Sequence, residues 1–146
     1  HRDLHSFPTR RSSDLTIFHG MLQKHKTAIK VLLMNQRFIA GLGNIYTDEA
    51  LHIARIHPLQ KSSSLTITDA QQLLRAIRDV LGEGIERQGA SIDWVYRGGD
   101  FQNYFKVYHR NGQACTSCGT LVEKITVGQR STHFCPCCQV NDQTKM

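Results

Sequence analysis

The sequence has 146 residues, which suffices for one domain of common size or for two small ones. Its 18 lysine and arginine residues outnumber its 12 acidic residues and give a formal net charge of +6. This surplus favours a polyanionic partner such as nucleic acid. No uninterrupted apolar run approaches the roughly 20 residues of a membrane-spanning helix, which excludes a protein that crosses the membrane in this way.

Residues 1–15 differ in character from the rest of the chain. They lack a lasting helical period and mix proline, serine and arginine, a composition typical of disorder. They also resemble a translated sequencing adaptor. We therefore predict that this segment is extraneous and disordered, and that the natural chain enters near Thr16.

The next segment predicts two helices separated by a turn. Apolar residues recur with a helical period from position 27, and Lys26 and Lys30 stand one turn apart on one predicted face. Glycines at positions 41 and 43 should end this helix, because glycine favours turns with positive φ. Asn44 is predicted to cap the second helix, which ends before Pro58.

A third helix is predicted after the polar linker at residues 61–64. Thr68 and Gln71 have the spacing of a capping box, and apolar residues follow at helical steps until Gly89. The glycine-rich residues 90–102 are predicted to form a loop. Short β-like runs follow at residues 106–108 and 121–127 and replace the helical pattern. We therefore expect a helical module followed by a small β module.

Four of the five cysteines form two C-x2-C pairs that are separated by sixteen residues. Pairs with this spacing, here Cys115 with Cys118 and Cys135 with Cys138, can close a tetrahedron around one zinc ion. Four thiolates leave no open position, so the predicted zinc is structural. The alternatives to a zinc site are two structural disulfides or a redox-active pair. Cys137 is predicted not to be a ligand, although it could take the place of one in a C-x-C pairing with Cys135. An odd cysteine count without a signal peptide favours a reducing cytoplasm.

Two further elements could bind phosphate. The turn at residues 41–44 leads into a helix whose backbone N–H groups and dipole suit an anion, with Lys26 and Lys30 adding charge. The alternative is a helix hairpin with an ordinary cap and two solvated lysines. The second element is a predicted hairpin at residues 128–132 with Arg130 at its tip, whose guanidinium suits phosphate and minor-groove contacts. Its alternative is a plain polar turn.

These motifs resemble those of a known family. Residues 35–51, NQRFIAGLGNIYTDEAL, resemble the helix–two-turn–helix signature of bacterial formamidopyrimidine-DNA glycosylases. The GQRST run at residues 128–132 and the two cysteine pairs resemble that family's C-terminal zinc finger. Both motifs stand in the family's order and separation, and the resemblance covers about residues 24–139.

The resemblance implies an α+β fold in which a helical DNA-binding domain precedes a small β-hairpin zinc finger with four cysteine ligands. The expected ranges are residues 16–100 for the helix–two-turn–helix domain, with a lesion-covering loop at 90–102, residues 101–139 for the zinc finger and 140–146 for a tail. It also implies a monomeric, bifunctional DNA glycosylase and abasic-site lyase. Such an enzyme flips 8-oxoguanine or a formamidopyrimidine out of duplex DNA, excises it and nicks the strand by β,δ-elimination.

The resemblance also implies roles for particular residues. Asn44 would bind a phosphate beside the lesion, and Lys26 and Lys30 fall at basic DNA-contacting positions. Arg130 would grip the phosphates that flank the flipped nucleotide and donate a proton in the δ-elimination. Tyr108 would touch a phosphate.

The family's catalytic residues have no counterpart here. Its nucleophile is an N-terminal proline, accompanied by a glutamate and by a lysine of a β-sandwich domain. Residue 1 is histidine and Pro8 is internal, so we expect a C-terminal fragment that is inactive alone. The alternatives are an endonuclease VIII-type enzyme for oxidised pyrimidines, a non-catalytic damaged-DNA-binding module, and a zinc-ribbon interaction protein. The length of the 90–102 loop favours the purine enzyme over the pyrimidine enzyme.

Overall fold

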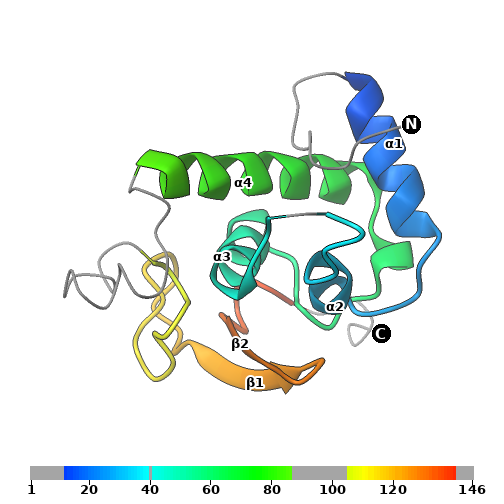
Figure 1. Cartoon of the computed structure of the whole chain (residues 1–146). Coiled ribbons are helices and arrows are strands. Elements are labelled where there is room, and N and C mark those ends of the chain that lie inside the picture. Colours follow the sequence, from blue (N-terminus) through cyan, green and yellow to red (C-terminus); the bar gives the residue numbers. More distant parts are fainter. Residues whose placement is uncertain (1–11, 40, 87–104, 141–146) are drawn as a thin grey trace.

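The computed structural model describes residues 12–39, 41–86 and 105–140 (Figure 1). These residues form four α-helices, a 3-10 turn and one antiparallel hairpin. Their bounds are α1 (Ser12–Gln23), α2 (Ile29–Leu33), α3 (Asn44–Ala54), η2 (Ser62–Ser64), α4 (Ile67–Glu86), β1 (Glu123–Val127) and β2 (Arg130–Phe134). The predicted α+β architecture is confirmed. None of the helices described has both the length and the apolar character needed to cross a membrane.

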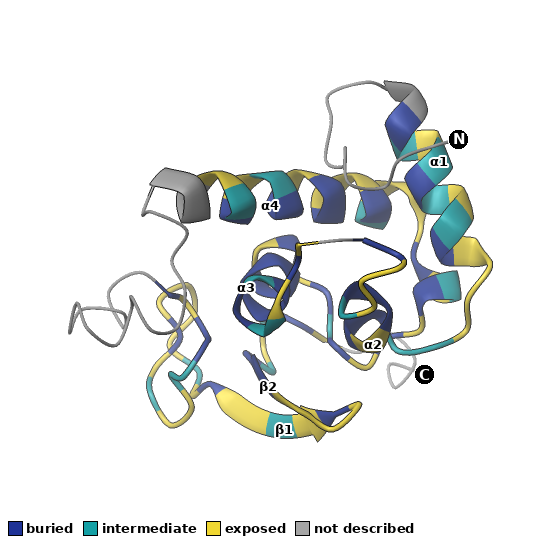
Figure 2. Cartoon of the chain, viewed as in Figure 1, coloured by how far each residue is buried: buried dark blue, intermediate teal, exposed yellow. Residues whose placement is uncertain are grey.

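The helices form one hydrophobic core, which we call the helical module (residues 12–86). Helix α4 lies over α3, and α1 also packs against α4 (Figure 1). The predicted amphipathic pattern of α4 is confirmed, because its apolar side chains face this core and its opposite side is exposed (Figure 2). The largest fully buried side chains of the core include Phe18, Leu22, Leu51, Leu73 and Ile77.

Helix α4 begins with a capping box, but two residues earlier than predicted. The Thr66 hydroxyl accepts the backbone N–H of Asp69 at 3.1 Å, and the Asp69 carboxylate accepts the N–H of Thr66 at 3.0 Å. The predicted pair, Thr68 and Gln71, lies inside the helix. Aspartate at the third position satisfies the cap as glutamate or glutamine would, and the buried Leu65 fixes the chain just before it.

Helix α1 begins inside the segment that the sequence analysis set apart. In contrast to the disorder predicted for residues 1–15, residues 12–15 are helical, Asp14 is buried and Leu15 packs against the core. Residues 1–11, the predicted loop at 90–102 and the predicted boundary near residue 100 lie outside the described residues. The domain ranges therefore stay predictions.

The remainder of the described chain, residues 105–140, forms the cysteine module. Strands β1 and β2 pair with Val127 opposite Arg130, so the turn consists of Gly128 and Gln129 alone. Both turn residues have positive φ, 58° and 67°, which is the geometry of a type I′ hairpin. Arg130 is thus the first residue of β2, directly after the turn rather than at its tip.

Helix α3 holds the cysteine module through a buried glutamate. The carboxylate of Glu49 accepts the backbone N–H groups of Lys106, Val107 and Tyr108 at 2.8 to 2.9 Å. Burial raises the pKa of Glu49, and the three N–H groups act in the opposite direction by favouring the carboxylate. One side chain therefore fixes the start of the module against α3.

We expect Glu49→Gln to weaken this attachment. A neutral amide has one acceptor oxygen and turns its NH2 group toward at least one N–H donor, which should lower the free energy of unfolding by about 2 kcal/mol. A urea titration followed by circular dichroism measures the loss. Glu123→Gln, at an exposed position of β1, is the matched control, and equal stability of the two variants would contradict the assignment.

Candidate metal centre and nucleic-acid interface

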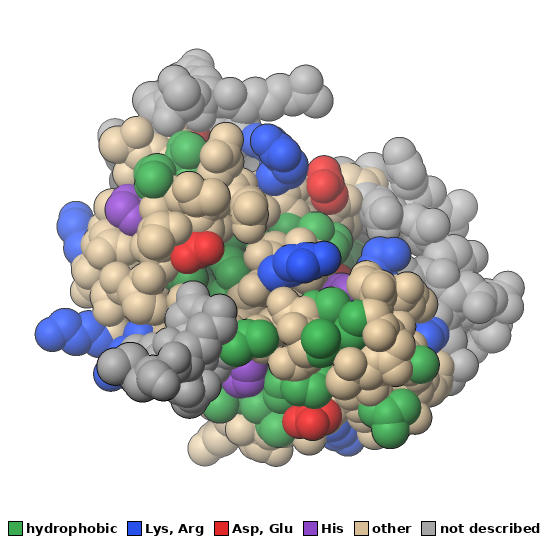
Figure 3. All heavy atoms as spheres, turned by 180° about the vertical axis from the view of Figure 1, so that it is seen from behind, with side chains coloured by type: hydrophobic (Ala, Val, Ile, Leu, Met, Phe, Trp, Pro, Cys, Tyr) green, Lys and Arg blue, Asp and Glu red, His purple; other side chains and the backbone are tan. Residues whose placement is uncertain are grey.

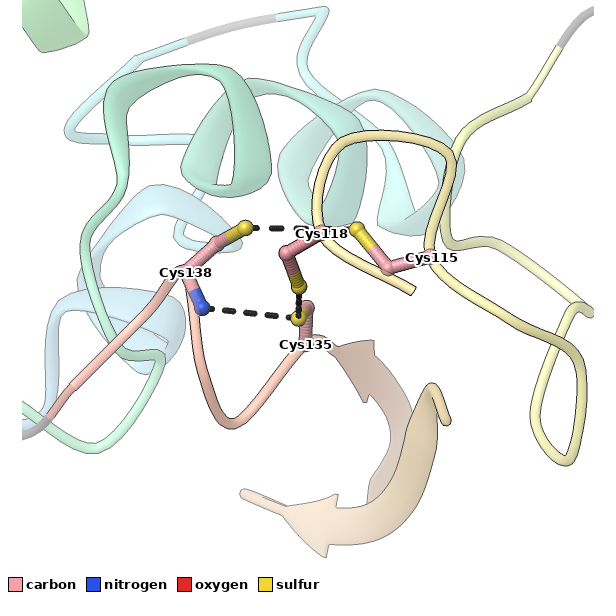
Figure 4. Close-up of side chains that lie close together, drawn as sticks. All are labelled: Cys115, Cys118, Cys135 and Cys138. Carbon is pink, nitrogen blue, oxygen red and sulfur yellow. Dashed lines mark hydrogen bonds between the residues drawn. The ribbon is translucent and has the colours of Figure 1, made fainter. Parts of the chain in front are cut away.

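The four paired cysteines meet at one point of the cysteine module (Figure 4). Their sulfur atoms all lie within 4.8 Å of one another, with Cys115 to Cys138 at 3.9 Å and Cys118 to Cys135 at 3.4 Å. Zinc–sulfur bonds of about 2.3 Å require tetrahedral sulfur separations of about 3.8 Å. The sulfur atoms therefore fit one structural zinc ion.

The backbone around the sulfurs also suits a thiolate cluster. The N–H of Ser117 points to the Cys115 sulfur and the N–H of Cys138 to the Cys135 sulfur, each at 3.4 Å. Such donors stabilise negative charge on sulfur. All five cysteines are free of disulfides, which argues against the disulfide alternative. Cys137 is exposed and lies outside the cluster.

We expect Cys118→Ser to lose its zinc. A hydroxyl replaces one thiolate, and the cysteine module has few other sources of folding energy, so it should unfold. Zinc content by mass spectrometry and thermal unfolding by circular dichroism measure both effects. Cys137→Ser, which removes the neighbouring exposed thiol, should keep the full zinc content. A Cys118 variant that matches this control would contradict the ligand assignment.

The two predicted phosphate elements meet in the structure. The side-chain amide of Asn44, at the start of α3, donates to the backbone carbonyl of Ser131 at 3.1 Å. The ammonium group of Lys30 approaches the same carbonyl at 3.4 Å. Because Ser131 follows Arg130 on β2, this carbonyl joins the helical turn to the strand that carries the arginine.

Asn44 does not cap α3 as predicted. It is the first residue of the helix, and Gly43 occupies the cap position without a side-chain cap hydrogen bond. Its amide is instead directed to Ser131, because β2 passes beside the start of α3. The alternative of an ordinary N-cap is therefore wrong.

Lys30 is buried and not a solvated cation. Its ammonium group lies 2.5 Å from a carboxylate oxygen of Asp48, and both side chains are fully buried. The other Asp48 oxygen accepts the backbone N–H and contacts Nδ1 of His133, both at 3.0 Å. Burial lowers the pKa of Lys30, and Asp48 partly offsets that effect.

Lys26 and Lys30 do not share a helical face as predicted. Helix α2 begins only at Ile29, so Lys26 precedes the helix and is exposed. The spacing rule applies only when one helix contains both residues. Lys26 therefore remains a surface cation, whereas Lys30 belongs to a buried cluster with Asp48 and His133.

Tyr108 and Arg130 also occupy different environments. Tyr108 is buried, with its ring stacked on His109 at 4.3 Å and edge-on to His133 at 5.0 Å. Arg130 is exposed and borders a surface hollow that Val31 and Asn35 also line. Of the predicted DNA-contacting residues, Lys26 and Arg130 thus have accessible charges.

Sequence reasoning missed three buried polar residues of α3, namely Asp48, Glu49 and His52. A signal was available for the carboxylates, because Asp48 and Glu49 directly precede Ala50 and Leu51 on one short amphipathic helix. A charged side chain in such a place needs a partner. The partners of Glu49 begin 57 residues away, and Asp48 binds His133, 85 residues away, as well as Lys30, 18 residues away; no local pattern identifies these partners.

Comparison with known proteins gives the family. Residues 4–95 match the family model of the formamidopyrimidine-DNA glycosylase H2TH domain, which is more than half of the chain. Residues 112–140 match the zinc finger found in FPG and IleRS. The chain belongs to the formamidopyrimidine-DNA glycosylase family.

Individual relatives agree with this assignment. The formamidopyrimidine-DNA glycosylase of Pelotomaculum thermopropionicum is 48% identical over 122 residues, which are 81% of this chain and 44% of the relative. The Lactococcus lactis enzyme bound to DNA with an AP site superposes with a TM-score of 0.80 at 37% identity, over 92% of this chain and 49% of that one. Its complex with FAPY-dG-containing DNA gives 0.82 at 38% identity, over 92% and 50%. The chain thus spans about half the length of the curated relatives it matches.

We expect Lys30→Met to destabilise the fold, because it leaves the buried Asp48 carboxylate without its ammonium partner. The loss of one member of a buried ion pair should cost about 3 kcal/mol. The midpoint of a urea titration measures it. Lys26→Met removes a nearby exposed lysine and should leave the midpoint unchanged. If both variants unfold at the same urea concentration, the buried cluster contributes no stability.

Proposed function

We propose that this chain supplies the DNA-binding part of a formamidopyrimidine-DNA glycosylase. In the whole enzyme it binds duplex DNA that contains 8-oxoguanine or a formamidopyrimidine. The enzyme removes the oxidised purine in base-excision repair and cleaves the abasic product by β,δ-elimination. Its place of action is the nucleoid, in the cytoplasm of a bacterium.

The observation that carries the proposal is the shared contact at the carbonyl of Ser131. Asn44 and Lys30 both approach this carbonyl, so the positive end of α3 and the strand of Arg130 form one continuous surface. A helix N-terminus beside an accessible guanidinium suits consecutive phosphates of a DNA strand. The two family motifs therefore act as one interface.

The overall charge supports this assignment without locating the interface. A zinc ion with four thiolates adds about −2 and lowers the formal charge from +6 to about +4. On the face shown in Figure 3, the basic side chains of the described residues are scattered among neutral ones. We therefore locate the interface from the contacts of Asn44 and the exposure of Arg130.

Four of the predicted residues contact the DNA, and one positions the strand that carries Arg130. Arg130 contacts the phosphates that flank the extruded nucleotide and donates the proton of the δ-elimination, and Lys26 adds a further phosphate contact. Asn44 uses one amide hydrogen on Ser131 and directs the other to a phosphate. Lys30 acts through Asp48 and Ser131 by positioning β2. Tyr108 contributes a phosphate contact through its hydroxyl group.

We expect Arg130→Ala to weaken binding to a duplex with an abasic-site analogue by about tenfold while zinc content stays unchanged. The loss of one phosphate contact should also reduce the slope of log affinity against log salt by about one. Fluorescence anisotropy between 50 and 200 mM salt, as a rough working range, measures both.

The matched control is Lys124→Ala, which removes an exposed cation from β1 of the same hairpin. If both variants bind alike, the hairpin contributes only general charge, and the role assigned to Arg130 is wrong. Excision distinguishes the purine enzyme from the endonuclease VIII type. The whole purine enzyme should excise 8-oxoguanine from a duplex in preference to thymine glycol, and the endonuclease VIII type should show the opposite preference.

A further inference from the structure

A histidine from the helical module reaches the metal centre. His52 lies on α3, is 5% exposed, and places its Nε2 atom 3.6 Å from the sulfur of Cys115. The backbone donors to the sulfurs of Cys115 and Cys135, from Ser117 and Cys138, belong to the cysteine module itself. His52 instead stands 63 residues away from Cys115 in sequence and arrives from another element.

The chemistry of the two partners determines which one donates. A zinc-bound cysteine is a thiolate, which can only accept a hydrogen bond. The Nε2 atom must therefore carry the hydrogen. The Nδ1 atom of His52 is buried and has no hydrogen-bond partner among the residues described. An unpaired lone pair is tolerated there more readily than an unpaired N–H group.

We infer that His52 is an outer-sphere partner of the zinc site that donates its Nε2–H to the Cys115 thiolate. The hydrogen bond stabilises the negative charge on this sulfur, which makes the thiolate harder to protonate and therefore keeps it in the form that binds zinc. It also ties the metal centre to α3, the helix whose N-terminus faces Ser131. No family motif quoted above includes this residue.

A second contact between the same two elements supports this coupling. The side chain of Gln139 accepts the backbone N–H of Cys135 at 2.8 Å and donates to the carbonyl of Ile56 at 3.0 Å. Ile56 is the second residue after the end of α3, next to the cap residue Arg55. The chain next to the second cysteine pair is therefore fixed to the C-terminal end of this helix, which holds the Cys115 sulfur and His52 in register.

The first test uses the unmodified chain, in which zinc is replaced by ¹¹³Cd and histidine nitrogen is labelled with ¹⁵N. Nuclear magnetic resonance should show His52 as the Nε2–H tautomer, with a scalar coupling between this hydrogen and ¹¹³Cd across the sulfur. A ring protonated at Nδ1 would overturn the inference. This measurement needs no variant and therefore does not depend on how a variant folds.

The second test uses variants and two readouts that involve no DNA. His52→Phe keeps the ring volume without the donor, and His52→Gln keeps an N–H near the same place. In the cobalt-substituted protein, His52→Phe should move the sulfur-to-metal charge-transfer bands to lower energy. Its zinc should also be lost more readily to a competing chelator, with an affinity about tenfold lower, which is the lower end of the range for such partners.

The variant series includes its own controls. His52→Gln should restore both readouts toward the values of the unmodified chain. His57→Phe replaces a half-buried histidine just beyond α3 that packs on Phe134, and it should change neither. The inference is wrong if His52→Phe behaves like His57→Phe in both measurements. Because zinc release is measured without DNA, this failure is distinguishable from a failure of the proposed function.

Discussion

Two neighbouring carboxylates of α3 are buried, and each is directed to a different part of the cysteine module. Glu49 binds the backbone at residues 106–108, and Asp48 binds His133 on β2 together with Lys30. Consecutive side chains of a helix point about 100° apart, so the carboxylates of Asp48 and Glu49 contact the cysteine module in two different directions. A buried carboxylate without partners costs several kcal/mol. Separating the two modules would therefore leave Glu49 without the three N–H groups that it binds and Asp48 with Lys30 alone, so these contacts fix the orientation of the two modules.

The two modules reach stability by different physical means. The helical module encloses a contiguous apolar core that α1, α3 and α4 build together. Among the described residues of the cysteine module, one small buried cluster consists of Val107, Cys115, Val122 and Cys135, and two of these belong to the candidate metal centre. A lone two-stranded hairpin is marginal in water. Metal ligation and the contacts to α3 therefore provide the folding stability that the small core lacks. Both also hold β2 in place, and with it the backbone of the exposed Arg130.

Sequence patterns predicted those features of the fold that depend on residues close together in the chain. The cysteine spacing predicted the four sulfur atoms that the fold brings together, and the apolar period predicted α4, because both signals act within short stretches of chain. Lys30 was misjudged because its spacing from Lys26 presupposed one continuous helix and a solvated face. Its partner Asp48 is 18 residues away and His133 is more distant still. Side chains that bond across the fold leave no periodic trace, so the partners of Glu49 and His52 could not be predicted for the same reason.

The contact at Ser131 shows how the fold can separate positioning from recognition. The acceptor is a backbone carbonyl, and the Ser131 side chain is exposed. The location of β2 therefore depends on the two donors, Asn44 and Lys30, and not on the side chain at position 131. Because Lys30 is itself fixed by Asp48, the strand is tied to the same helix that carries the carboxylate pair. The guanidinium of Arg130 needs no buried contact of its own, and its full charge stays available at the surface.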